Sequence, residues 1–121
     1  MNATGNTILI QFTSDPDIAI REILASGPAN KIAIEVKGGQ DASNLHNRVG
    51  EAEKSHNKAK ADGFPECWTI INVDGLDSAG KTKISRESPT TNRWYWISQI
   101  GDITSSEYLD FKSRIKSACS I

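Results

Sequence analysis

The sequence has no long apolar run, few aromatic residues and almost no excess of charge. No apolar stretch approaches the roughly 20 residues that a membrane-spanning helix needs. The first residues have no basic segment followed by an apolar one, so we expect no secretory signal and a cytoplasmic protein. The formal net charge is -1, whereas nucleic-acid-binding domains usually carry a basic field. Any affinity for a polyanion must therefore come from local groups.

Cysteine is also scarce. Cys67 and Cys119 lie far apart in the chain and match no zinc-ligand spacing. They are therefore predicted to be reduced thiols that pack as small apolar groups. A chain of 121 residues is long enough for one domain with a modest core. We expect a core over 7–74, a basic loop over 75–92, and an aromatic segment and helix over 93–121.

Three apolar runs in the first third of the chain predict strands. The run 7–13 is rich in β-branched and aromatic residues and predicts a buried strand. The runs 17–23 and 31–37 alternate apolar and polar residues, so we expect an antiparallel hairpin with a loop over 25–30. If Ile23 lies near Lys31, then Asp17 comes opposite Lys37, close to Glu35. Asp15 then projects beyond the paired region, although a two-residue slip would reverse the choice between the two acids.

The rest of the chain predicts helices, one further strand and one segment that is either a strand or a short helix. A helical stripe of small and apolar residues predicts a helix over 43–61 that Gly63 ends and that Asp41 or Ser43 caps. The stripe consists of Leu45, Val49, Ala52, His56 and Ala59. A buried strand over 67–73 follows and should run parallel to 31–37. The segment 93–100 is a strand or a short helix, and a terminal helix over 105–117 starts at Ser105 or Ser106. The fold class is therefore a mixed α/β sheet of four to five strands flanked by helices.

Charged residues on one face of the predicted sheet suggest a metal site. Two carboxylates, of Asp17 and Glu35, and the carbonyl oxygen of Val36 are the oxygen ligands that Mg²⁺ prefers. A metal held there makes a water more acidic, and Lys37 can orient that water or offset charge on a phosphate. The alternative is a set of solvated surface charges with little energetic effect.

The motif Pro16-Asp17 followed by Glu35-Val36-Lys37 resembles the PD-(D/E)xK nuclease superfamily. The stretch from Glu35 to His56 is similar to XcyI-type type II restriction endonucleases, which cut the palindrome CCCGGG. The resemblance implies a restriction-endonuclease-like core, Mg²⁺-dependent cleavage of double-stranded DNA, 5′-phosphate ends and a homodimer. It implies that Asp17, Glu35 and Lys37 are catalytic. These enzymes are longer and their core opens with a helix, so we expect a fragment, a minimal member or a decayed gene product.

Two polar segments are candidates for DNA contacts. Asn44, Asn47 and Arg48 share a helix face that begins just beyond the predicted metal ligands, and Asn and Arg can bond phosphates and base edges. The second segment is the basic loop, which can follow a phosphate backbone or merely solubilise the protein. The cationic residues of this loop are Lys81, Lys83 and Arg86, and Arg93 follows it directly. His56 is expected to be packed and hydrogen-bonded, and Trp94 and Trp96 to serve packing.

Two other functions remain open on the same sequence. A junction resolvase or repair nuclease on the same core would cut branched or nicked DNA with little sequence preference. A catalytically inactive DNA-binding module would keep the sheet and need not bind a metal. Metal titration separates the inactive module from the nucleases, and cleavage of DNA with and without CCCGGG separates the two nucleases.

Overall fold

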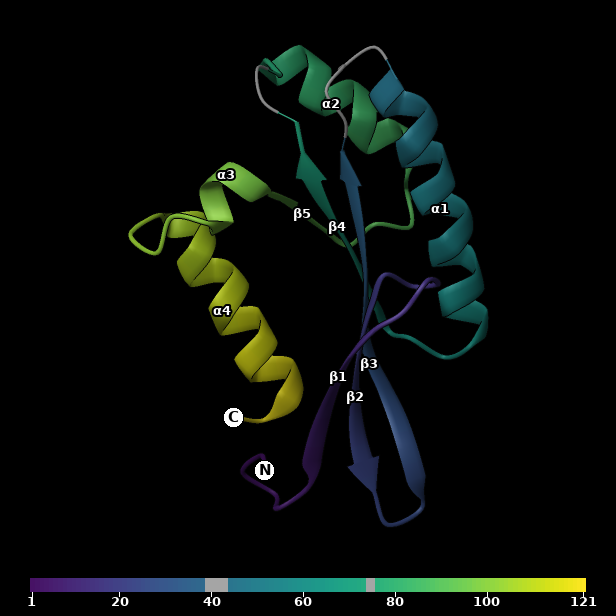
Figure 1. Cartoon of the computed structure of the whole chain (residues 1–121), viewed down its shortest axis with the longest axis vertical. Helices are drawn as coiled ribbons and strands as arrows, with labels where there is room; N and C mark the ends of the chain where they lie inside the picture. Colours follow the sequence, from purple (N-terminus) through teal and green to yellow (C-terminus); the bar gives the residue numbers. More distant parts are fainter. Residues whose placement is uncertain (39–43, 74–75) are drawn as a thin grey trace.

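The computed structural model describes residues 1–38, 44–73 and 76–121. Its centre is a five-stranded mixed sheet with the strand order β1-β2-β3-β4-β5 (Figure 1). The strands are β1 (Thr7–Phe12), β2 (Ile18–Leu24), β3 (Gly27–Gly38), β4 (Glu66–Asn72) and β5 (Arg93–Trp96). The helices are α1 (Leu45–Ala61), α2 (Ser78–Glu87), α3 (Ile97–Ile100) and α4 (Ser106–Cys119). The predicted mixed sheet flanked by helices is confirmed.

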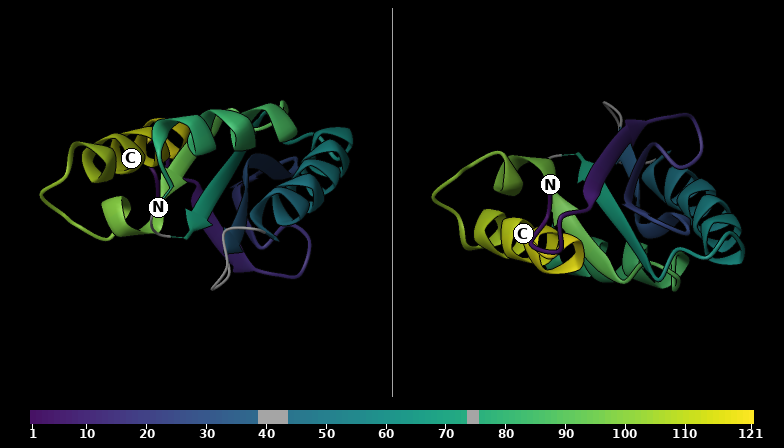
Figure 2. Two further views of the ribbon diagram at one scale, coloured as in Figure 1. Left: turned by 90° about the horizontal axis from the view of Figure 1, so that it is seen from above. Right: turned by 90° about the horizontal axis from the view of Figure 1, so that it is seen from below.

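Helices cover both faces of the sheet. Helix α1 packs on β3 and β4 from one side, and α4 packs from the other, so that the sheet lies between them (Figure 2). Alternation along the strands sends small and polar side chains toward α1 and large apolar ones toward α4. On the α4 side, Trp68, Tyr95 and the isoleucines of β2 and β3 form the largest buried cluster. Among the described residues, no helix combines the length and apolarity needed to cross a membrane.

The hairpin of β2 and β3 is tighter than the sequence predicted. The predicted loop over 25–30 is wrong, because β3 already begins at Gly27, whose φ of 123° allows a short turn. Ile23 consequently pairs with Pro28 and not with Lys31. A bulge between Ile20 and Arg21 then shifts the register, so that Ile18 lies opposite Ile34. The shortened loop and the bulge move the start of β2 along β3 from its predicted position.

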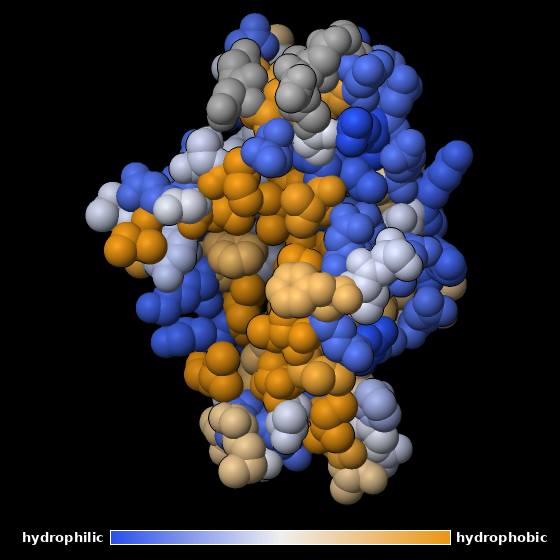
Figure 3. All heavy atoms as spheres, in the orientation of Figure 1, coloured by the Kyte–Doolittle hydropathy of each residue, from blue (hydrophilic) through white to orange (hydrophobic). Residues whose placement is uncertain are grey.

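Strand β1 is at the edge of the sheet and is not buried, which corrects the prediction for 7–13. Leu9 is 36% exposed, Ile10 53% and Phe12 82%. An apolar run without alternation is typical of a strand covered on both faces. Among the described residues, β1 pairs with β2 alone, and the apolar side chains of β1 contribute to the apolar area at the centre of the face shown in Figure 3.

Helix α1 presents the predicted stripe to the sheet. All five residues of that stripe are buried, which confirms the helical periodicity. The helix ends before Gly63, whose φ of 93° is readily adopted only by glycine. The proposed caps Asp41 and Ser43 lie outside the described residues. At the other end of the chain, the Ser105 hydroxyl accepts a hydrogen bond from the Tyr108 amide at 3.0 Å, so Ser105 is the N-cap of α4.

The basic segment after β4 is a helix, which corrects the predicted loop over 75–92. Helix α2 begins after Asp77, whose carboxylate accepts a hydrogen bond from the Gly80 amide at 2.7 Å. Its residues are mostly polar, and Ile84 is its one buried residue. The helix is anchored by Ile84 against α1 and β4. The segment 93–100 contains both predicted alternatives, because strand β5 leads directly into the short helix α3.

Candidate active site

The first turn and the central strand bring the predicted acids together. Asp17 lies directly before β2, and its Oδ2 accepts a hydrogen bond from the backbone N–H of Val36 at 2.9 Å. Continuing the β2–β3 register by one residue from Ile18 and Ile34 places Asp17 opposite Glu35. The prediction that Asp17 faces Lys37 is therefore wrong by two residues, but the proximity of Asp17 to the Glu35-Val36-Lys37 segment is confirmed. Both carboxylates point to the α1 side of the sheet.

Glu35 is held in an environment that disfavours its charge. The residue is 1% exposed. Burial and the nearby Asp17 carboxylate raise the pKa of Glu35 to about 7, although Lys37 acts in the opposite direction. The Lys37 ammonium lies 3.5 Å from Glu35 Oε2. The ammonium of Lys37, whose side chain is 18% exposed, is therefore one positive charge beside two carboxylates, which leaves a net negative charge at the site.

Asp15 belongs to a different set of contacts. Its carboxylate lies 2.8 Å from the Lys58 ammonium on α1. The hydrogen bond from Lys58 holds the pKa of Asp15 below its usual value. The Asp15 carboxylate thus already has a cationic partner, whereas the Asp17 carboxylate touches the backbone of the Glu35-Val36-Lys37 segment. The geometry favours Asp17 over Asp15 as the second acid beside Glu35.

The donor set fits a hard divalent cation. Two carboxylates and the Val36 carbonyl supply oxygen ligands only, which suits Mg²⁺ and similar ions. Glu35 Oε1 is buried and has no hydrogen-bond partner among the described residues, and a nearby cation would offset the charge of this carboxylate. No cluster of three acidic, histidine or cysteine side chains that could hold a metal occurs in the described part of the chain. The remaining ligands of a bound ion would then be waters or substrate oxygens.

The end of β3 is packed closely against β4. A Cβ atom at Gly38 would lie 2.6 Å from the backbone oxygen of Asn72, which is closer than van der Waals contact allows. Glycine therefore lets the two parallel strands approach directly after Lys37. This close pairing fixes the backbone that carries Glu35 and Lys37.

Most of the predicted DNA contacts lie on two neighbouring helices. Asn44, Asn47 and Arg48 are exposed at the N-terminal end of α1, and α2 packs beside that helix (Figure 1). On α2, Lys83 and Arg86 are exposed, while the Lys81 ammonium lies 4.6 Å from the ring centre of Trp96. These cations stand on a helix and not on the predicted loop.

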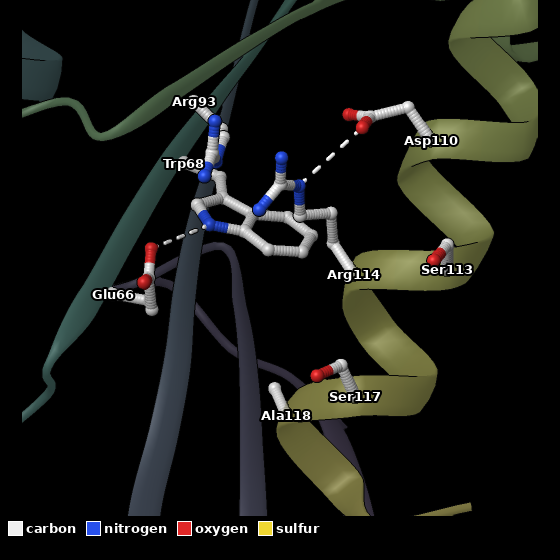
Figure 4. Close-up of a pocket in the computed structure, with 8 residues that line it drawn as sticks. All are labelled: Glu66, Trp68, Arg93, Asp110, Ser113, Arg114, Ser117 and Ala118. Atoms are coloured by element: carbon white, nitrogen blue, oxygen red, sulfur yellow. Dashed lines mark hydrogen bonds and ion pairs between the residues drawn. The ribbon is translucent and has the colours of Figure 1, made fainter.

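Arg93 is separated from these residues by the sheet. Arg93 on β5 is the register partner of Trp68 on β4. Its side chain lines a cavity of about 320 Å³ between β4, β5 and α4, on the face away from α1 (Figure 4). In this cavity the Trp68 indole N–H donates to Glu66 at 3.1 Å, and Arg114 pairs with Asp110 at 3.3 Å. Strand alternation directs the Arg93 side chain to the opposite face of the sheet, so the structure does not bring it together with the other predicted DNA-contacting residues.

A buried polar group beside Glu35 was not anticipated. Thr69 on β4 is the register partner of Glu35, and its hydroxyl lies 2.9 Å from His56 Nε2 on α1. His56 is fully buried and hydrogen-bonded, as predicted. The signal in the sequence was a lone hydroxyl in the apolar run of β4, facing the same side as a histidine on the buried stripe of α1.

The fold and this acidic site together define a class of protein. The mixed sheet, the acid before β2, the Glu-x-Lys of β3 and the crossover helix are the arrangement of a restriction-endonuclease-like core. The family model of the XcyI restriction endonuclease matches residues 1–121, so the chain belongs to this family.

Curated relatives support this membership. The chain is 49% identical to the type II restriction enzyme Cfr9I of Citrobacter freundii, over 99% of this chain and 36% of that protein. It is also 49% identical to the type II restriction enzyme XcyI of Xanthomonas campestris pv. cyanopsidis, over 99% of this chain and 35% of that protein. The chain thus spans about a third of the length of these relatives. No solved structure matches it significantly.

Proposed function

We propose that this chain carries the catalytic core of a Mg²⁺-dependent endonuclease that hydrolyses DNA phosphodiesters at a CCCGGG-type site. The observation that carries the proposal is the contact of Asp17 with the Glu35-Val36-Lys37 backbone on one face of the sheet. Family membership supports the same reaction, because both relatives are named type II restriction enzymes.

Each side chain has a distinct task in this proposal. Asp17, Glu35 and the Val36 carbonyl would hold Mg²⁺, which makes a water a better nucleophile at neutral pH and offsets charge on the attacked phosphate. Val36 N–H fixes the Asp17 carboxylate by its 2.9 Å hydrogen bond. The Lys37 side chain is 18% exposed and stands beside Glu35, so its ammonium can donate to the attacking water or to a phosphate oxygen.

The neighbouring helices α1 and α2 offer a surface for the DNA backbone. Arg48, Lys83 and Arg86 are exposed there, and the amides of Asn44 and Asn47 can bond phosphates or base edges. Because the chain as a whole carries a net charge of -1, this local concentration of cations provides the electrostatic attraction in the proposal. Arg93 has no part in this surface.

The proposal includes a homodimer. The exposed apolar residues of the edge strand β1, Ile10 and Phe12, support association with a second copy, since a sheet edge with apolar side chains readily pairs. Light scattering after size-exclusion chromatography is expected to give twice the chain mass. The variant Phe12→Ser should shift the protein to the monomer, whereas Ile103→Ser, at an apolar residue outside β1 that is 70% exposed, should not. A wild-type monomer at high micromolar concentration would exclude this dimer.

Metal binding and cleavage test the function together. Isothermal titration with Mn²⁺ should show one binding event in wild type and none in Asp17→Asn, with Asp15→Asn as the matched control that still binds. A plasmid with one CCCGGG site should be linearised in Mg²⁺, and a plasmid lacking that site should remain intact. Equal cutting of both plasmids would favour the resolvase-like or repair nuclease, and a wild-type chain that binds no metal would leave the inactive DNA-binding module.

A further inference from the structure

A chain of hydrogen bonds runs away from the candidate site through the protein interior. It links His56 Nε2 to Thr69 Oγ1 at 2.9 Å, Thr69 to Thr91 at 2.8 Å, and Thr91 to Ser88 at 2.8 Å. The chain ends at Glu53 on α1, whose Oε1 accepts from Ser88 at 3.2 Å. His56, Thr69 and Ser88 are fully buried. Buried polar networks of this kind fix side-chain orientation, because a broken link leaves a group unsatisfied.

The acceptor at the end of the chain sets the direction of every bond. A glutamate carboxylate at neutral pH accepts hydrogen bonds and donates none, and Glu53 Oε1 also accepts from the Thr90 amide at 3.0 Å. Each hydroxyl has a single proton, so the Ser88 hydroxyl donates to Glu53 and must accept from Thr91. Thr91 in turn accepts from Thr69, whose own oxygen is then left to accept from His56.

This direction determines the tautomer of His56. Nε2 must carry the proton, because it donates to Thr69 Oγ1, and Nδ1 must carry a lone pair. Nδ1 is buried and has no hydrogen-bond partner among the described residues. Burial and the nearby cations Lys37 and Lys60 lower the pKa of His56 to about 4, so the ring is neutral near pH 7. The imidazole therefore presents an unused acceptor inside the protein.

A second unused acceptor lies on the neighbouring strand. Glu35 Oε1 is also buried without a partner in the part of the chain that the structure describes. Glu35 and Thr69 are register partners on β3 and β4, and Thr69 contacts His56, so the three side chains share one side of the sheet beneath α1. With Glu35 ionised, as it is when it holds a cation, both groups only accept and cannot satisfy one another, whereas one water molecule has two hydrogens to donate. Buried waters occur in proteins where otherwise unsatisfied polar groups gather.

We propose that His56 is a positioning residue for Glu35, acting through one buried water that donates to His56 Nδ1 and to Glu35 Oε1. The water would hold the Glu35 carboxylate in one orientation while Oε2 remains beside Lys37. Outer groups that orient a metal-binding carboxylate commonly change metal affinity by tenfold or more. The tautomer follows from the hydrogen bonds alone, whereas the effect on metal binding rests on the proposed function.

Nitrogen-15 NMR of the imidazole tests the tautomer without any metal. Wild type should show a protonated Nε2 and an unprotonated Nδ1 at pH 7. Glu53→Ala removes the acceptor that directs the chain, so the two tautomers should become mixed, whereas Glu51→Ala, an exposed residue on the same helix, should change nothing. A wild-type ring protonated at Nδ1 would overturn the proposal.

Two substitutions of His56 test the positioning. In His56→Gln, the amide nitrogen can still donate to Thr69 but the acceptor at Nδ1 is lost, so stability should be kept and Mn²⁺ affinity should fall about tenfold. In His56→Asn, the amide oxygen can replace Nδ1 but cannot reach Thr69, so stability should fall while affinity in the folded protein stays near wild type.

The pattern of outcomes separates this proposal from the proposed function. Unchanged Mn²⁺ affinity in a folded His56→Gln variant would refute positioning by His56, even if wild type cleaves DNA. Absence of Mn²⁺ binding in wild type would refute the proposed function and, with it, the metal role of His56. The NMR tautomer would still decide whether the hydrogen-bond chain runs toward Glu53.

Discussion

Glu35→Gln is expected to abolish metal-dependent cleavage and to stabilise the metal-free protein above pH 7. In the proposed function Glu35 is a charged metal ligand, so its loss should lower the cleavage rate on the order of 10³-fold. The stability gain has a separate cause. Glutamine has the same shape, its amide oxygen can still accept from Lys37, and it carries no charge into a position that is 1% exposed.

The pH dependence of this gain follows from the raised pKa. The pKa of Glu35 rises from 4.5 to about 7 in the folded protein, mainly through burial and secondarily through Asp17. Above pH 7 the folded state keeps an unfavourable charge whose cost is roughly 3 kcal/mol. As the pH falls from 7 to 4.5, the folded state takes up a proton that the unfolded state does not, so this cost disappears. The advantage of glutamine should therefore be large at pH 8 and absent at pH 4.5.

Urea unfolding in EDTA at pH 8 and at pH 4.5 measures this difference. Glu51→Gln, an exposed position on α1, is the matched control and should change stability at neither pH. Mn²⁺ should reverse the order, because it stabilises wild type and not Glu35→Gln. Lys37→Ala should also lose cleavage but should lower stability at pH 8, since it leaves Glu35 without its cation. A Glu35→Gln variant less stable than wild type at pH 8 would show that the carboxylate is not strained.

The elements with strong periodicity could be predicted from the sequence. The stripe on α1 from Leu45 to Ala59 is buried as predicted, because a spacing of 3.6 residues places these side chains on the one helix face that packs against the sheet. Alternation placed Glu35 on the polar face of its strand, and the crossover rule gave the parallel pairing of β3 and β4. Asp17 lies close to Glu35 because Asp17 directly precedes β2 and Glu35 lies near the end of β3, and these two positions meet at the open end of the hairpin.

The predictions that failed concern segments whose residue pattern is compatible with more than one local structure. The bulge after Ile20 has no local signature, so the register could not be placed to better than two residues. The polar composition of α2 resembles that of a loop, because only Ile84 is buried. An apolar run such as β1 occurs in buried strands and in exposed edges alike, and burial of β1 depends on what covers it. The hydrogen-bond chain from His56 joins residues far apart in sequence, and only tertiary structure shows it.

Trp68→Ala is expected to have the largest effect on folding. The Trp68 ring is 1% exposed and lies 5.6 Å from the Tyr95 ring and 5.8 Å from the Phe111 ring of α4. Truncating a buried aromatic residue of this size costs about 3–5 kcal/mol, a large share of the ~5–15 kcal/mol that stabilises a typical domain. Trp68→Phe keeps part of the ring contacts and should lose much less.

The loss should be concentrated on the α4 side of the sheet. Trp68 and Phe111 connect β4 to α4, while Thr69, the next residue, faces α1 and the candidate site. Hydrogen exchange of Trp68→Ala at low temperature should therefore show α4 amides losing protection before those of β3 and α1. Mn²⁺ binding should persist under the same conditions, because Asp17 and Glu35 lie on the opposite face from Trp68. Uniform loss of protection across both faces would instead show that α4 and the elements on the α1 side of the sheet unfold as one cooperative unit.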